Sequence, residues 1–60
     1  MLTGLPKDPV ILLSVVNTKL RDFYPTLDAL CEDLEVSREF LTEKLGMIDY
    51  EYNPGKNQFE

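Results

Sequence analysis

The 60-residue sequence contains no histidine and only one cysteine. Without histidine, the chain lacks the commonest general base and the commonest zinc ligand of proteins. The single cysteine, Cys31, excludes a disulfide within these residues, so we expect a reducing compartment, the cytoplasm. Cys31 also has no second thiol with which to share a metal ion. We expect it to be a small core residue and not a nucleophile.

Long apolar runs and glycine-rich loops are also missing. The longest apolar block, residues 10–16, is far shorter than the roughly 20 residues that a membrane span needs, so we expect no membrane partner. The first residues do not have the pattern of a signal peptide. The three glycines, at positions 4, 46 and 55, are too scattered to form a phosphate-binding loop. We therefore predict no cofactor, no metal site and no catalytic residue, and we predict that the protein is not an enzyme.

The residues that are present are typical of a small folded domain. Hydrophobic residues make up 43% of the chain, which is far from the composition of a disordered segment. We expect one domain over residues 1–60, with a small core, because a chain of this length buries only about 60% of its unfolded surface. Eleven acidic residues against six basic ones give a net charge of −5. This balance disfavours nonspecific binding to nucleic acids and membrane surfaces.

The first predicted helix covers about residues 9–23. Asp8 can accept hydrogen bonds from the first backbone N–H groups, and proline suits the first helical position that follows. Leu12, Val16 and Leu20 recur at helical spacing. The alternative is a buried strand over residues 10–16, which are apolar and rich in β-branched side chains. The cap before this segment and the amphipathic residues after it favour the helix.

Two shorter helices are predicted over about residues 27–34 and 38–46. Thr26 and Ser37 can cap their amino ends, and Gly46 is the expected carboxyl cap of the second one. The inward-facing residues are expected to be Leu27, Leu30, Cys31 and Leu34 on the first of these helices, and Phe40, Leu41, Leu45 and Ile48 on the second. The spacing of the pair is that of a helix-turn-helix. Glu35 departs from that motif, because such turns usually carry glycine there to adopt a positive φ.

A β-hairpin is predicted over about residues 48–60. Ile48, Tyr50 and Tyr52 alternate with acidic residues, which indicates a half-buried strand. Residues 53–57 are typical of a turn, and Phe59 on the return strand is expected to face a tyrosine across the ladder. The predicted fold is therefore mostly α, a small α+β domain. It has three short helices, a helix-turn-helix-like pair and a C-terminal β-hairpin, and is winged-helix-like. The alternative is a three-helix unit with a disordered tail.

The outward face of the third helix bears on DNA binding, because the second helix of such a pair often lies in the major groove. The candidate residues for contact with DNA or a partner are Arg38, Thr42, Lys44 and Lys56. Residues 26–45, however, carry six acids and only two bases. DNA affinity comes mainly from lysine and arginine side chains that neutralise phosphates. A DNA-binding regulator is therefore the alternative function, and nucleic acid is a disfavoured partner.

Residues 10–16 carry more apolar surface than a small three-helix core can bury. Either the hairpin covers this surplus, or the surplus forms a patch that self-associates or takes a partner. The candidate residues for self-association are Val10, Ile11, Leu13 and Val15. Beside them lies a polar band, which is either helix surface or a partner-binding site; its residues are Asn17, Thr18, Lys19 and Arg21. The preferred function is a noncatalytic protein-interaction module, with an unknown protein partner or as a homodimer.

Three segments together resemble a family of short bacterial proteins catalogued as a domain of unknown function. They read LPKDPVILLSVVNTKLRDFY, LDALCEDLEVSREFLTEKL and IDYEYNPGKNQF, and they extend from about Leu5 to Phe59. The most specific parts are NTKLRD and YEYNPGKNQF. The resemblance implies a small cytosolic protein that stands alone. Because the family has no assigned activity, the resemblance implies no catalytic or binding residue.

Overall fold

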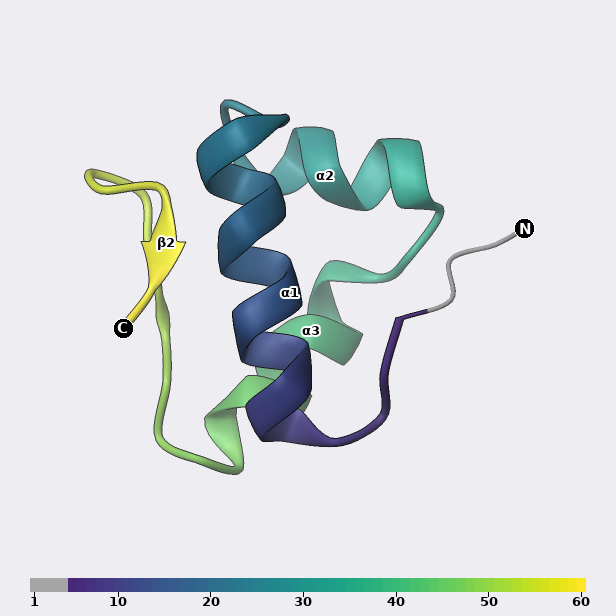
Figure 1. The fold of residues 1–60 in the computed structure, drawn as a ribbon, viewed down its shortest axis with the longest axis vertical. Coiled ribbons are helices and arrows are strands. Elements are labelled where there is room, and N and C mark those ends of the chain that lie inside the picture. The colour runs from purple at the N-terminus through teal and green to yellow at the C-terminus, as the bar shows by residue number, and fades with distance from the viewer. Residues whose placement is uncertain (1–4) are drawn as a thin grey trace.

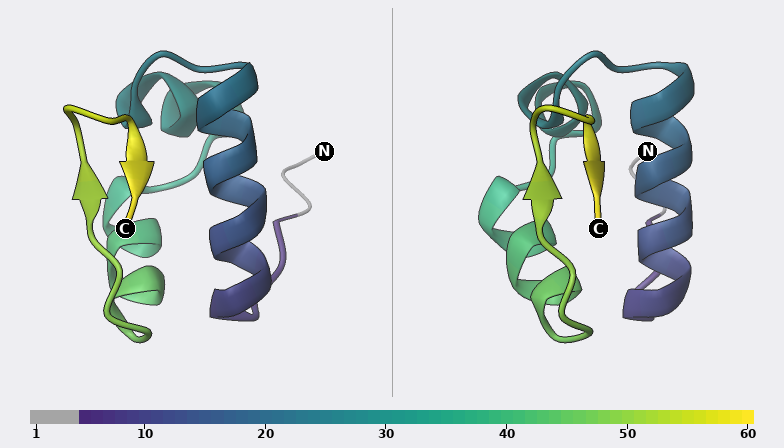
Figure 2. Two further views of the ribbon diagram at one scale, coloured as in Figure 1. Left: turned by 60° about the vertical axis from the view of Figure 1, so that its left-hand side comes forward. Right: turned by 90° about the vertical axis from the view of Figure 1, so that its left-hand side faces the viewer.

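Figure 1 shows the computed structural model of the protein, which describes residues 5–60. The elements are α1 (Pro9–Asp22), α2 (Leu27–Leu34), α3 (Arg38–Gly46), β1 (Tyr52–Asn53) and β2 (Gln58–Phe59). The two strands pair antiparallel, and α1 contacts α2, α3 and β2. In the two turned views the hairpin lies alongside α1, with β2 as the nearer strand (Figure 2). The predicted class, mostly α with three helices and a small hairpin, is confirmed.

Each helix begins at a residue whose side chain accepts a backbone hydrogen bond. The Asp8 carboxylate, the Thr26 hydroxyl and the Ser37 hydroxyl accept from N–H groups two or three residues further on, at 2.9, 3.1 and 3.2 Å. These groups have no partner within the helix, so the caps satisfy donors that would otherwise be left free. All three predicted caps are confirmed. The strand alternative for residues 10–16 is wrong, because they lie within α1.

The core is built from all three helices and from β2. Its buried residues are Leu12, Val16, Leu20, Leu27, Leu30, Cys31, Leu41, Leu45 and Phe59. The prediction that Cys31 is a core residue is confirmed. The inward position expected for Phe40 is wrong, since its side chain is exposed. Leu41 and Leu45 define the buried face of α3, and Phe40 is turned about 100° away from Leu41 around the helix.

The turn between α2 and α3 has a left-handed backbone geometry, although Glu35 stands where the turns of helix-turn-helix motifs usually carry glycine. Glu35 has φ 55° and ψ 46°. Its N–H donates to the Glu32 carbonyl, and the Val36 N–H donates to the Cys31 carbonyl at 3.0 Å. These two bonds form a Schellman motif, in which glycine usually holds the left-handed position. Glu35 therefore adopts a conformation that is unfavourable for a residue with a Cβ.

We expect Glu35→Gly to stabilise the protein. Removing the Cβ relieves the left-handed strain of roughly 1–2 kcal/mol, partly offset by the larger backbone entropy that glycine loses on folding. The net gain should be about 1 kcal/mol, or roughly 4–8 °C in Tm for a domain of this size, measured by circular dichroism. Glu32→Gly, inside α2, is the matched control and should lower the Tm. A lower Tm for Glu35→Gly would contradict the expectation.

The segment after α3 differs from the predicted strand. Residues 47–49 form a turn in which Asp49 has φ 65°, and the Tyr50 N–H donates to the Leu45 carbonyl at 3.0 Å. The strand expected from Ile48 is therefore wrong, and so is the carboxyl cap expected at Gly46, which is the last helical residue. Ile48 packs against the core from this turn. The inward position of Ile48 is compatible with a turn after a helix as well as with a strand, so this residue did not distinguish the two.

The hairpin itself is short and aromatic. β1 and β2 contain two residues each, with Tyr52 opposite Phe59. Their ring centroids lie 5.5 Å apart at an interplanar angle of 53°, which confirms the predicted aromatic pair. Beyond the strands, Glu51 and Glu60 exchange two backbone hydrogen bonds of 3.1 and 2.9 Å. Because an isolated hairpin of this size is marginal in water, its position depends on contacts with the helices.

Candidate functional site

Asn17 joins the hairpin to α1. Its Nδ2 donates to the Phe59 carbonyl at 3.0 Å, and its Oδ1 accepts from the Phe59 N–H at 2.8 Å. Phe59 does not exchange backbone bonds with Tyr52, so these two groups point away from β1. The Asn17 amide takes the place that a third strand would occupy. The sequence places Asn17 in a polar surface band, whereas in the structure it is a half-buried residue that docks the hairpin.

Asn57 joins the turn of the hairpin to the end of α1 and the start of α2. Its Nδ2 donates to the carbonyls of Leu20 and Tyr24, at 3.0 and 2.9 Å. Its Oδ1 accepts from the Tyr52 hydroxyl at 2.7 Å, and that hydroxyl accepts from the Leu27 N–H at 3.2 Å. Asn57 has φ 56°, a value that asparagine tolerates better than most residues. The segments NTKLRD and YEYNPGKNQF therefore contain residues that dock the hairpin. Asn17 belongs to the first segment, and Tyr52 and Asn57 belong to the second.

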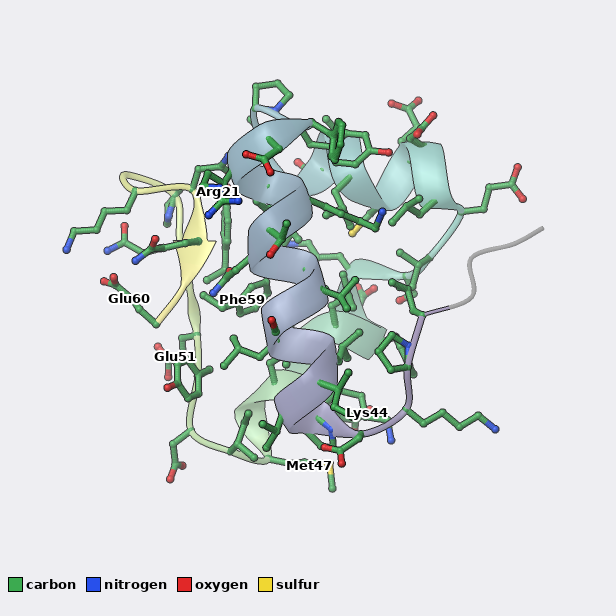
Figure 3. The ribbon with its side chains drawn as sticks, in the orientation of Figure 1. Arg21, Lys44, Met47, Glu51, Phe59 and Glu60 are labelled. Carbon is green, nitrogen blue, oxygen red and sulfur yellow. The ribbon has the colours of Figure 1, made fainter. Side chains whose placement is uncertain are left out.

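The docked hairpin leaves a groove between α1 and the hairpin turn, with a volume of about 480 Å³. Its lining residues are Ser14, Asn17, Thr18, Leu20, Arg21, Lys56, Asn57 and Gln58. Figure 3 shows Arg21 at the hairpin side of the carboxyl end of α1. Arg21 bonds Asp22 through Nε and Nη2 at 2.9 and 3.0 Å. This hydrogen bonding raises the pKa of Arg21 and lowers the pKa of Asp22.

The residues predicted to contact DNA or a partner do not form one site. Arg38 and Thr42 line a shallow depression on α3 together with Glu39 and Glu43. Lys56 instead lines the groove beside α1. Lys44 is half-buried in the last turn of α3, and Figure 3 places it near Met47, at the opposite end of the molecule from Arg21.

The depression on α3 is electrostatically mixed. The Arg38 guanidinium bonds the Asp28 carboxylate at 2.6 Å and lies 5.8 Å from the centroid of the Tyr52 ring. Hydrogen bonds from the backbone of Glu39 and from the Ser37 hydroxyl lower the pKa of the Glu39 carboxyl. Glu39 is therefore charged at neutral pH, beside an arginine that already has a carboxylate partner.

The amino end of α1 carries the most exposed aliphatic side chains of this helix. Val10 is 62% exposed and Ile11 is 54% exposed, whereas Leu13 and Val15 are half-buried. Met47, in the turn after α3, is 68% exposed, and the views agree that this turn lies at the same end of the molecule (Figures 1 and 2). We call Val10, Ile11 and Met47 the apolar end. The hairpin contacts α1 further along and leaves these side chains exposed.

Three further findings concern Cys31, metal binding and the lengths of the helices. Burial raises the pKa of the Cys31 thiol above its ordinary value. Among residues 5–60, no three side chains of the types that bind metals gather in one place. None of the helices in this part of the chain is long and apolar enough to cross a membrane.

A family model described as a domain of unknown function (DUF4250) matches residues 6–59. The search of curated proteins gave no match, and the search of solved structures gave none. The matched region contains Asn17 and the hairpin with Asn57, the residues that join the hairpin to α1. It agrees with the family that the sequence segments indicated, which confirms that prediction. The chain belongs to the family of the domain of unknown function DUF4250.

Proposed function

We propose that this protein is a noncatalytic interaction module of the cytoplasm that self-associates through the apolar end. The observation that carries the proposal is the exposure of Val10, Ile11 and Met47 at one end of the molecule. Single exposed hydrophobic residues are ordinary, but a group of them is typical of an interaction surface. The unpaired thiol of Cys31 is in keeping with a reducing compartment.

The form of the apolar end supports a contact between two copies. Val10 and Ile11 lie in the first turn of a helix capped by Asp8, so their backbone is fixed before a partner binds. The thioether of Met47 is flexible and adapts to an irregular surface. Twofold dimers use the same patch on both subunits, so one small apolar patch is sufficient. With about 1.5–3 kcal/mol for each buried side chain, offset by the entropy of association, we expect a weak dimer.

We expect Ile11→Glu to abolish self-association. The charge would enter an apolar contact, yet an acidic residue in the first turn of a helix favours the helix dipole, so the fold should be retained. Sedimentation velocity of the natural sequence, from micromolar to millimolar concentration, should show a rising sedimentation coefficient. Ile11→Glu should sediment as a monomer throughout. Thr42→Glu adds the same charge to exposed α3 and should behave like the natural sequence.

A natural sequence that remains monomeric over this whole range would refute the proposal. Equal behaviour of Ile11→Glu and Thr42→Glu would also refute it, because the effect would then come from net charge alone. Both variants need a circular dichroism spectrum that matches the natural one before their sedimentation is compared.

A DNA-binding regulator is the second candidate. It is supported by the exposed position of Arg38 and Thr42 on α3, the helix that follows the left-handed turn. Glu39 and Glu43 line the same depression and would face the phosphates. Since phosphate neutralisation supplies most of the affinity for DNA, this surface favours the interaction module over the regulator.

A further inference from the structure

We propose that the groove between α1 and the hairpin turn binds an acidic segment of a partner protein. The lining of this groove includes Arg21 and Lys56 and contains no aspartate or glutamate. The chain as a whole carries eleven acids and six bases. The groove lining thus presents two cations and no carboxylate of its own in a chain that is acidic overall, and it makes charge complementarity with an acidic ligand possible.

Three other surface depressions each include at least one acidic residue in their lining. The depression on α3 includes Glu39 and Glu43. The one at the carboxyl end of α1 includes Asp22, and the one beside β1 includes Glu51 and Glu60. A carboxylate ligand would meet like charges in each of these places. The groove is therefore the best of the four for an acidic ligand.

Two polar side chains of the groove hold the hairpin in place, and two others are exposed on α1. Asn17 and Asn57 are held by the hydrogen bonds that dock the hairpin, so their positions are fixed. Ser14 and Thr18, one helical turn apart on α1, have hydroxyls that bond to no group within residues 5–60. These hydroxyls can donate to carboxylate or peptide oxygens of a bound segment.

Both cations of the groove form exposed ion pairs with carboxylates of the protein. The Arg21–Asp22 pair joins two exposed neighbours, and Lys56 lies 3.7 Å from the Glu60 carboxylate. Exposed ion pairs of this kind contribute little to stability, because water and salt screen them. An incoming carboxylate can therefore replace the internal partner at little cost. The guanidinium of Arg21 can also hold a carboxylate through two parallel hydrogen bonds.

A peptide fits these features better than a nucleic acid. Only two cations converge on the groove, and the net charge of −5 repels a long polyanion. The groove also lies away from the apolar end, since Figure 3 shows Arg21 and Met47 at opposite ends of the molecule. Binding in the groove is therefore independent of self-association, and the occupant is a different protein and not a second copy.

The test is a titration of the ¹⁵N-labelled full chain with a capped hexaglutamate peptide, followed by amide chemical shifts. The salt concentration should be near 0.1 M, where the Debye length of about 10 Å screens distant acids and preserves contact pairs. We expect the shift changes to concentrate at groove residues Ser14, Thr18, Arg21, Lys56 and Gln58. A hexaglutamine peptide should give no such changes. No binding of hexaglutamate, or changes spread over the whole surface, would overturn the proposal.

Charge variants sharpen the test. The double variant Arg21→Gln with Lys56→Gln should weaken binding by about tenfold or more, since it removes two charge-assisted contacts. The double variant Lys7→Gln with Lys44→Gln removes the same charge outside the groove and should change affinity by less than about twofold. Equal losses in the two double variants would mean that only net charge matters, which would overturn the proposal.

Asp22→Asn should increase the affinity for hexaglutamate, because it removes the internal partner of Arg21. An increase cannot arise from a damaged fold, and an unchanged or lower affinity would count against the proposal. Sedimentation of the Arg21→Gln, Lys56→Gln variant separates the groove from the apolar end. Its self-association should match that of the natural sequence, whereas loss of self-association would show that a second copy occupies the groove and would overturn the assignment to a different protein.

Discussion

Phe59→Ala should destabilise the protein by about 3–5 kcal/mol, as is typical of a buried phenylalanine replaced by alanine. Phe59 is only 2% exposed and is among the largest fully buried side chains. At roughly 0.05–0.15 kcal/mol per residue, a chain of 60 residues has a total stability of only about 3–9 kcal/mol. One substitution near the end of the chain is thus expected to remove most of the stability.

Urea denaturation followed by far-UV circular dichroism measures this loss as a lower transition midpoint. Phe23→Ala is the matched control, because it removes the same ring from a side chain that is 70% exposed. The Phe23 ring lies 5.9 Å from the Lys19 ammonium, a contact that contributes about 0.5–1 kcal/mol at an exposed site. Similar midpoints for the two variants would mean that Phe59 does not belong to the core.

The position of Phe59 shows where sequence reasoning succeeds and where it stops. Its pairing with a tyrosine follows from the alternation and turn chemistry of the hairpin, which are local signals. Its burial against the helices depends on Asn17, which lies 42 positions earlier in the chain. No pattern of neighbouring residues encodes that contact. The sequence therefore indicated a hairpin but not how the hairpin is attached.

The helix ends also include some features that local sequence predicts and others that it does not. The caps at Asp8, Thr26 and Ser37 could be predicted, because each side chain bonds a backbone group within three residues. The left-handed residues Glu35 and Asp49 could not be predicted from a preference for glycine. At both positions the chain must turn so that apolar residues close by can reach the core, and packing outweighs the local backbone preference.

The candidate surfaces were predictable to different degrees. The surplus of apolar residues at the start of α1 pointed to Val10 and Ile11, which are exposed. It also pointed to Leu13, which packs against the core. The groove could not be foreseen, because it exists only after the hairpin docks and brings Lys56 beside α1. The ion pair between Arg38 and Asp28, ten residues apart, likewise could not be predicted from the number of charged residues.

Asn57→Ala is expected to destabilise the protein by about 4–5 kcal/mol, from three lost hydrogen bonds and the added backbone strain. The variant loses the bonds to the Leu20 and Tyr24 carbonyls and the bond from the Tyr52 hydroxyl. Lost hydrogen bonds in half-buried positions cost about 1 kcal/mol each, and an alanine at φ 56° adds strain of roughly 1–2 kcal/mol. Urea denaturation of the variant gives the free energy of unfolding directly.

Asn57→Gly separates these two causes, because glycine removes the side chain and accepts the left-handed backbone. It should be more stable than Asn57→Ala by about 1 kcal/mol and still less stable than the natural sequence. Combining Asn57→Gly with Tyr52→Phe completes a double-mutant cycle. A shared hydrogen bond requires the combined loss to be smaller than the sum of the single losses, by at least about 0.5 kcal/mol. Strict additivity would mean that Asn57 holds the end of α1 and that Tyr52 holds the start of α2 independently. The hairpin would then be attached by separate contacts and not by one network.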